Sequence, residues 1–168
     1  MLTLKSKIII AAIGFALAPI SLHLGVVPIS MQTLVLFTVA ALLTPKEALI
    51  FGLLYLVLGA IGVPIFGGFT AGFEKLYGPT SGFLWGFPVL CAFISWDVKQ
   101  NPPAFIHLAI SFFKAHVLLL IPGFLVLYFL LPGVKIWDTF VQLLPGLFIK
   151  TTLGALLVLG LKKGLHTA

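Results

Sequence analysis

Charged side chains are scarce in this chain of 168 residues. They make up 8% of it, as ten Lys, four acids and no Arg, while apolar residues make up 61%. A soluble domain carries about a quarter charged residues, and so few charges cannot cover a water-exposed surface. Cys91 is the single cysteine, which excludes a disulfide within the chain. The lysines are scattered rather than clustered, which argues against a nucleic-acid-binding face.

Sequence motifs of enzymes and of metal sites are also absent. The chain has no Walker loop, no HExxH pair and no nucleophile placed near a base and an acid. Its four histidines and four acids do not show metal-ligand spacing. We therefore expect neither an enzyme nor a metal site. If the chain takes part in ATP-driven uptake, another subunit must supply the ATPase.

What the chain does contain is six apolar segments, divided by short breaks rich in Gly, Pro and polar residues. They cover residues 8–24, 29–43, 48–61, 81–94, 104–131 and 136–161, and the clearest polar break is 96–103. Spanning a bilayer takes about 20 apolar residues, fewer where a helix is short or tilted. The first segment has no persuasive cleavage site, so we expect a retained helix and not a signal peptide. The sequence predicts an all-α, polytopic membrane protein whose residues 1–168 form a single domain, one bundle of six transmembrane helices.

The lysines predict how the bundle is oriented. Six lysines, at positions 5, 7, 46, 99, 162 and 163, fall on the side of the bundle that holds both termini. Lys75 and Lys135 fall on the other side. Because cytoplasmic loops carry an excess of Lys, we expect a multi-pass protein of the cytoplasmic membrane with both termini in the cytoplasm. The stretch Gly62 to Thr80 then faces outward.

This outward stretch, GVPIFGGFTAGFEKLYGPT, combines glycines with aromatic residues. Glycine lets backbone approach a ligand closely, and irregular backbone at membrane depth is tolerated where it lines a cavity. The stretch is therefore a candidate lid or wall over a small-molecule site. The alternative is an interfacial loop whose aromatic rings sit at headgroup level.

Two lysines fall inside apolar segments. Lys150 precedes Lys162 by 12 residues, which is about 18 Å along a helix and places it in the outer half of the bilayer. A charge there is costly unless it is paired or hydrated, so Lys150 is a candidate partner for an anionic ligand such as a carboxylate. The alternative is snorkelling to the outer headgroups. Lys114, beside His116, could bind a ligand, face a partner or snorkel inward.

Small residues recur every four positions in the first segment, at Ala12 and Ala16 and again at Gly14 and Ala18. Such a strip lets another helix approach closely. The spacing alone does not separate packing within the chain from an interface with another subunit.

Three ordered blocks resemble the BioY family, the biotin-specific S components of energy-coupling factor (ECF) transporters. They are VPISMQTLVLFTVAALLTPKEA at 27–48, LLYLVLGAIGVPIFGGFTAGFEKLYGPTSGF at 53–83 and PGLFIK at 145–150. The resemblance implies a six-helix protein that captures biotin from the outer side. It also implies partners, namely a T-component membrane subunit and ATP-binding cassette ATPase subunits, with Ala12 and Ala16 at the T-subunit interface. No cofactor is implied, because biotin is bound as the transported substrate.

The chain departs from the family pattern at two positions. Leu147 stands where the family often has an acid, and Ser81 replaces a glycine. Because the chain has no Arg, no arginine can serve the ligand. The expected ligand-binding residues are Lys150, Gln32, Tyr55, Phe66, Gly67, Gly68, Tyr77, Gly78, Pro79 and Thr80.

Two alternatives stay open. One is an S component for a different vitamin or small carboxylate, which would suit the same aromatics and lysine. The other is a stand-alone secondary transporter, which would call for an acidic residue within a helix. In our interpretation the four acids, Glu47, Glu74, Asp97 and Asp138, lie at helix ends or in loops.

Overall fold

Six α-helices and one small antiparallel sheet form the described part of the chain. The computed structural model describes residues 3–22, 26–100 and 102–167, with side chains as far as Lys163. The helices are α1 (Leu4–Leu17), α2 (Gln32–Leu42), α3 (Pro45–Ala60), α4 (Ser81–Gln100), α5 (Phe105–Leu130) and α6 (Ile136–Thr167). Strands β1 (Ser21–Leu22) and β2 (Ile29–Ser30) pair with each other, and the short 3-10 helix η1 (Phe73–Leu76) precedes α4. The predicted all-α bundle of six helices is confirmed.

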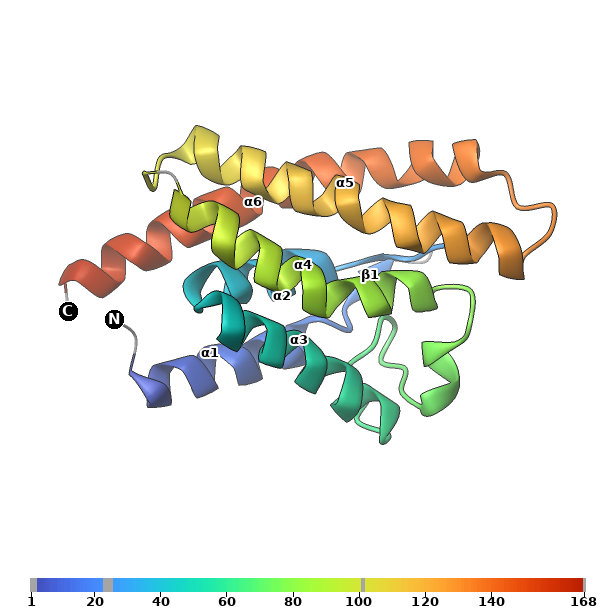
Figure 1. Cartoon of the computed structure of the whole chain (residues 1–168), viewed down its shortest axis with the longest axis horizontal. Coiled ribbons are helices and arrows are strands. Elements are labelled where there is room, and N and C mark those ends of the chain that lie inside the picture. The colour runs from blue at the N-terminus through green and yellow to red at the C-terminus, as the bar shows by residue number, and fades with distance from the viewer. Residues whose placement is uncertain (1–2, 23–25, 101, 168) are drawn as a thin grey trace.

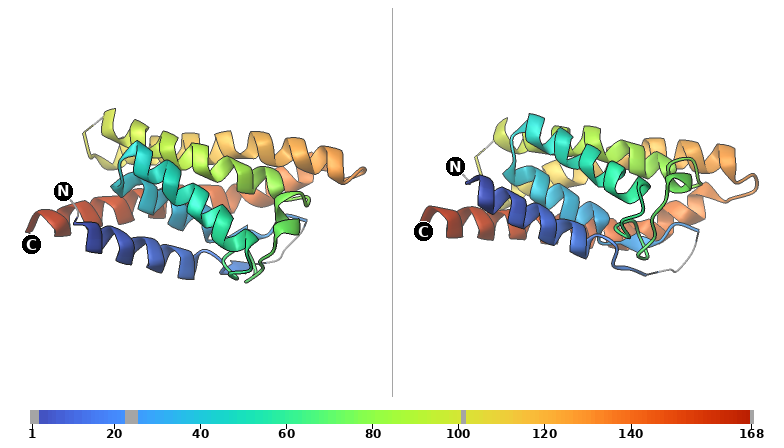
Figure 2. Two further views of the ribbon diagram at one scale, coloured as in Figure 1. Left: turned by 60° about the horizontal axis from the view of Figure 1, so that its bottom comes forward. Right: turned by 90° about the horizontal axis from the view of Figure 1, so that it is seen from below.

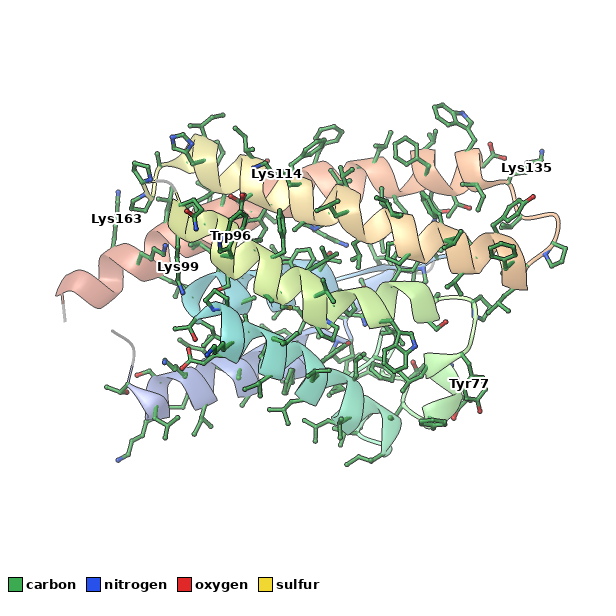
Figure 3. The ribbon with its side chains drawn as sticks, viewed as in Figure 1. Tyr77, Trp96, Lys99, Lys114, Lys135 and Lys163 are labelled. Atoms are coloured by element: carbon green, nitrogen blue, oxygen red, sulfur yellow. The ribbon has the colours of Figure 1, made fainter. Side chains whose placement is uncertain are left out.

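The helices run side by side along the long axis of the molecule (Figures 1 and 2). α1 begins and α6 ends at the same end of the bundle, while the segment carrying η1 and the turn between α5 and α6 lie at the opposite end. Figure 3 shows Lys99 and Lys163 at the first end and Tyr77 and Lys135 at the second. We call these the lysine-rich end and the loop end.

α2 is the central helix of the bundle. It contacts α1, α3, α4 and α6, and eight of its eleven residues are buried. A helix that is apolar on all sides reaches a stable position only when neighbours cover every face. The remaining helices pack around it and present large apolar side chains outward, among them Ile13, Leu54, Val89, Leu125 and Phe148.

Three of the described helices are long and apolar enough to cross a membrane by themselves: α4, α5 and residues Ile136–Lys163 of α6. Their 20, 26 and 28 residues correspond to about 30, 39 and 42 Å. α1, α2 and α3 have 14, 11 and 16 residues. The strands β1 and β2 lie between α1 and α2 in the chain, so extended backbone follows α1 and precedes α2.

Two predicted boundaries were wrong. The first segment was expected to be helical from 8 to 24, but α1 begins at Leu4, where the Thr3 hydroxyl accepts from the Ser6 N–H at 3.2 Å. α1 ends before Pro19, whose ring nitrogen carries no hydrogen to continue the helix. Ser21 and Leu22 are extended, and residues 23 and 24 lie outside the described residues.

The polar break expected from Trp96 is helical instead, because α4 continues to Gln100 before Pro102 and Pro103. Its polar side chains find partners on neighbouring elements. The ammonium of Lys99 donates to the carbonyl of Leu43 at 2.7 Å, and Asp97 pairs with a lysine of α5.

Glycines on α3 and α4 allow the helices to approach closely. A Cβ on Gly82 would overlap the backbone carbonyl of Pro122 in α5, and one on Gly52 would meet the backbone of Pro88. Gly52 and Gly82 therefore serve packing inside the chain.

Candidate ligand-binding site

A cavity of about 260 Å³ lies between the loop-end halves of α2, α4, α5 and α6. The start of α2 and the strand before it form one wall, and the segment between α3 and α4 covers another. Its lining is mainly apolar and aromatic, with a few polar groups, which is the usual make-up of a small-molecule site. The lining residues used below are Ser30, Gln32, Thr33, Phe66, Gly67, Thr70, Lys75, Thr80, Phe83, Phe87, His116, Leu147 and Lys150.

A chain of hydrogen bonds fixes the wall formed by α2. The Ser30 hydroxyl donates to Oε1 of Gln32 at 2.7 Å, and Nε2 of Gln32 donates to the Tyr55 hydroxyl at 2.6 Å. The Tyr55 hydroxyl in turn donates to the Ile65 carbonyl at 2.7 Å. Tyr55 is fully buried behind the cavity wall. The chain thus ties β2, α2 and α3 to the start of the covering segment.

The segment 62–80 is anchored at several points along its length. The N–H of Gly68 donates to the Pro19 carbonyl and the N–H of Gly72 to the Gly59 carbonyl, both at 2.8 Å. Gly68 and Gly72 have φ angles of +73° and +114°, a region that favours glycine. At the far end, Nε1 of Trp85 donates to the Leu76 carbonyl at 2.8 Å. Anchoring of this kind gives the segment a defined position over the cavity.

Both interpretations of this segment describe part of it. Phe66, Gly67, Thr70 and Lys75 line the cavity, as a lid or wall would. Phe69, Phe73 and Tyr77 are exposed, and Phe73 packs edge-on against Tyr77 with ring centroids 5.8 Å apart. Exposed aromatics at the loop end suit the headgroup region of a bilayer.

Phe66 is held in the cavity wall by a glycine beneath it. Its ring packs so closely on Gly59 of α3 that a Cβ there would overlap the ring. The ring of Tyr55 packs edge-on against the ring of Phe66, with centroids 5.5 Å apart. The glycine therefore sets the depth of the cavity on this side.

The PGLFIK block supplies the facing wall from α6. Gly146 packs against β2, where a Cβ would lie 2.9 Å from a methyl group of Ile29. Leu147 and Lys150, three residues apart and therefore on one face of the helix, both line the cavity. Lys150 lies 14 residues after α6 begins, about 21 Å from the loop end. It therefore lies near the middle of the spanning part of α6, Ile136–Lys163, and not in the outer half that the sequence predicted.

The cavity is electropositive in its composition. Lys75 and Lys150 line it, and among its described lining residues there is no Asp or Glu. Neither lysine forms an ion pair within the described part of the chain. A carboxylate in the ligand could therefore meet an uncompensated ammonium here.

The structure brings together half of the ligand-binding residues expected from the sequence. Lys150, Gln32, Phe66, Gly67 and Thr80 line the cavity. Tyr55, Gly68, Tyr77, Gly78 and Pro79 lie outside its lining. Tyr55 and Gly68 act from behind by holding the wall, whereas Tyr77 is exposed at the loop end.

Several cavity residues did not stand out in the sequence. Phe83 and Phe87 follow Thr80 at helical spacing, so the face of α4 that begins with Thr80 could have indicated them. The position of Lys75 in the lining could have been predicted by placing the whole glycine-rich segment 62–80 over the site. His116, by contrast, comes from the middle of α5, and nothing in the sequence places it opposite Lys150.

Lys114 and the small-residue strip lie outside the cavity. Lys114 pairs with Asp97 on α4. On α1, Gly14 and Ala18 are buried, and Gly14 packs against Val39 of α2. Ala12 and Ala16 are exposed. The two overlapping small-residue spacings thus face opposite ways, one into the bundle and one outward.

Comparison with known proteins places this chain in a family. The family model described as the BioY family matches residues 3–167. "Biotin transporter BioY2" of Lactococcus lactis subsp. cremoris is 42% identical over 119 residues, which are 71% of this chain and 65% of that protein. "Biotin transporter BioY" of Thermotoga maritima is 33% identical over 146 residues, 86% of each chain. The aligned region of a Pyrococcus horikoshii relative covers 44% of that protein.

The fold has a counterpart among solved structures. The crystal structure of an S-component for biotin from an ECF-type ABC transporter matches with a TM-score of 0.78. The two chains are 23% identical, and the match covers 97% of this chain and 95% of the other. The helix bundle thus recurs in a solved structure. The chain belongs to the BioY family.

Proposed function

We propose that this protein captures biotin on the outer side of the cytoplasmic membrane, as the substrate-binding S component of an ECF-type transporter. The relatives with which the sequence aligns are named as biotin transporters. The solved structure that shares the fold is described as an S-component for biotin. A transport component, and not an enzyme, is what these similarities support.

The observation that carries the proposal is the cavity, because its chemistry matches the three parts of biotin. The bicyclic ring and the valerate chain are apolar and suit the aromatic lining formed by Phe66, Phe83 and Phe87. The valerate carboxylate is an anion and suits a site with two ammonium groups and no acid among its described lining residues. The ureido group needs both donors and acceptors, which polar lining residues supply.

We further propose the ligand-binding set Lys150, Gln32, Phe66, Gly67 and Thr80, which the cavity brings together, with Tyr55 as the residue that orients Gln32. Biotin is the transported substrate, and the protein needs no cofactor. The partners are a T-component membrane subunit and ATP-binding cassette ATPase subunits, because the chain has no Walker loop. Both termini lie in the cytoplasm, and residues 1–168 act as one domain.

Equilibrium binding of biotin to the purified chain in detergent tests the proposal. Lipoate shares the five-carbon carboxylate tail but lacks the ureido ring, and desthiobiotin keeps the ureido ring but lacks the sulfur. We expect biotin to bind most tightly, desthiobiotin to compete and lipoate to compete weakly or not at all. Riboflavin and thiamine should not compete. Binding of lipoate or another vitamin in preference to biotin would instead indicate an S component for a different ligand.

Reconstitution separates this function from that of a stand-alone transporter. We expect liposomes holding this chain alone to bind biotin without concentrating it. Uptake against a gradient should require the T component and the ATPases. Concentrative uptake by the chain alone, driven by an ion gradient, would favour a secondary transporter.

A further inference from the structure

His116 is a buried polar residue of the cavity wall that the sequence did not assign to the site. It is 5% exposed and comes from the middle of α5. Its ring packs edge-on against Phe37 of α2, with centroids 5.3 Å apart. The ring is therefore held from both its own helix and the central helix, and His116 is among the residues that line the cavity.

The hydrogen bond at Nδ1 fixes how the ring presents its other nitrogen. Nδ1 lies 2.8 Å from the backbone carbonyl of Phe112. A carbonyl oxygen only accepts hydrogen bonds, so Nδ1 must carry the proton. In a neutral imidazole Nε2 then carries a lone pair. Nε2 is buried and has no partner among the described residues.

The neutral form is the one expected at this position. A charge is costly inside a membrane unless it is paired, and Lys75 and Lys150 already place two ammonium groups in the cavity. No carboxylate among the described lining residues is available to compensate a third positive charge. His116 thus offers the ligand a fixed, unpartnered acceptor.

Strong hydrogen-bond acceptors are scarce in the cavity, because no carboxylate lies among its described lining residues. Leu147 of α6, three residues before Lys150, lies buried in the cavity wall. A leucine cannot accept a hydrogen bond from a ligand. The two lysines only donate, and Oε1 of Gln32 already accepts from Ser30. Apart from His116, the other side-chain acceptors of the described lining are hydroxyls, which also donate: those of Ser30, Thr33, Thr70 and Thr80.

We propose that Nε2 of His116 accepts a hydrogen bond from a ureido N–H of the ligand and so selects for a cyclic urea. The inference rests on the proposed function and deepens it. An apolar ring of the same shape would leave the unpartnered acceptor unsatisfied, and a buried polar group without a partner is costly. The site thereby distinguishes biotin from carboxylates that have only an apolar ring.

The test compares His116→Phe and His116→Gln with the parent, using biotin and its two mono-N-methyl ureido derivatives. His116→Phe keeps an aromatic ring against Phe37 and removes the acceptor. We expect it to weaken biotin binding at least about tenfold, equivalent to about 1.4 kcal/mol. His116→Gln, which can offer a carbonyl oxygen, should retain part of the affinity. The methyl derivative that lacks the relevant N–H should bind the parent weakly and lose little more in His116→Phe.

A spectroscopic measurement on the parent protein removes the dependence on folded variants. With ¹⁵N-labelled histidine, Nε2 of His116 should resonate as an unprotonated ring nitrogen and move upfield when biotin is added. An unchanged Nε2 resonance in the biotin complex, or equal losses for all three ligands in His116→Phe, would overturn the inference. A parent that binds no biotin would overturn the proposed function itself.

Discussion

The ammonium of Lys114 on α5 contacts both carboxylate oxygens of Asp97 on α4, at 3.2 and 3.3 Å. The Asp97 side chain is 9% exposed, whereas that of Lys114 is 47% exposed. Asp97 lies one turn from the end of α4, at the lysine-rich end, and Lys114 lies in the third turn of α5. The pair therefore joins the two helices where a lone carboxylate would be buried without compensation.

Lys114→Met should destabilise the protein without removing a ligand-binding group. Breaking a buried ion pair by removing one partner typically costs about 3–5 kcal/mol, and the partial exposure of Lys114 lowers the expected loss to roughly 2–4 kcal/mol. Thermal unfolding in detergent measures the effect as a lower midpoint. Adding Asp97→Asn removes the uncompensated charge and should restore much of the stability. A Lys114→Met protein as stable as the parent would show that the pair contributes nothing.

The helices and the family could be predicted from the sequence, because long apolar runs and ordered motifs are local signals. The polar run at Trp96–Gln100 led to a wrong prediction of where α4 ends. Its charges are compensated by residues distant in the chain: Asp97 by Lys114, and Lys99 by the Leu43 carbonyl. The same limit applies to the site. Lys150 stood out as a charge in an apolar run, whereas the proposed role of His116 depends on the contact of its ring with Phe37 of α2 and on the packing of α5 against α6.

The proposed orientation of the bundle rests on the two groups of lysines and is testable by labelling. In a Cys91→Ala background, a membrane-impermeant maleimide applied to intact cells should label Tyr77→Cys at the loop end. Gln100→Cys at the lysine-rich end should react only after the cells are opened. Both positions are exposed, so access to solvent does not distinguish them. Labelling of Gln100→Cys from outside would reverse the proposed orientation.

The exposed alanines of α1, Ala12 and Ala16, predict where the T component docks. Ala12→Trp or Ala16→Trp should prevent close helix approach and reduce both recovery of the complex and biotin uptake. Biotin binding to the isolated chain should persist, because neither alanine lines the cavity. Leu125→Trp, an exposed position on α5, is the matched control and should leave assembly intact. If both alanine variants assemble and transport as the parent does, the strip lies outside the interface.

Lys150 is the cavity residue whose removal should weaken biotin binding most directly. Lys150→Met keeps an apolar chain of similar length and removes the ammonium, and Lys75→Met makes the same change at the other lysine of the cavity. Truncating one partner of a buried charge pair costs roughly 2–5 kcal/mol. We therefore expect Lys150→Met to weaken biotin binding at least about tenfold, or about 1.4 kcal/mol, in an equilibrium assay.

Biotin amide, which lacks the carboxylate, shows what each lysine contacts. If Lys150 meets the carboxylate, the amide should bind the parent weakly and lose little more in Lys150→Met. If Lys150 meets the ureido ring instead, acid and amide should lose affinity equally in Lys150→Met. Lys75→Met should then be the variant that weakens binding of the acid and spares the amide. Because the two lysines sit in the same cavity but on different elements, this comparison separates charge in the cavity from charge at one position. A folded Lys150→Met protein that binds biotin as the parent does would make Lys150 a snorkelling or structural lysine.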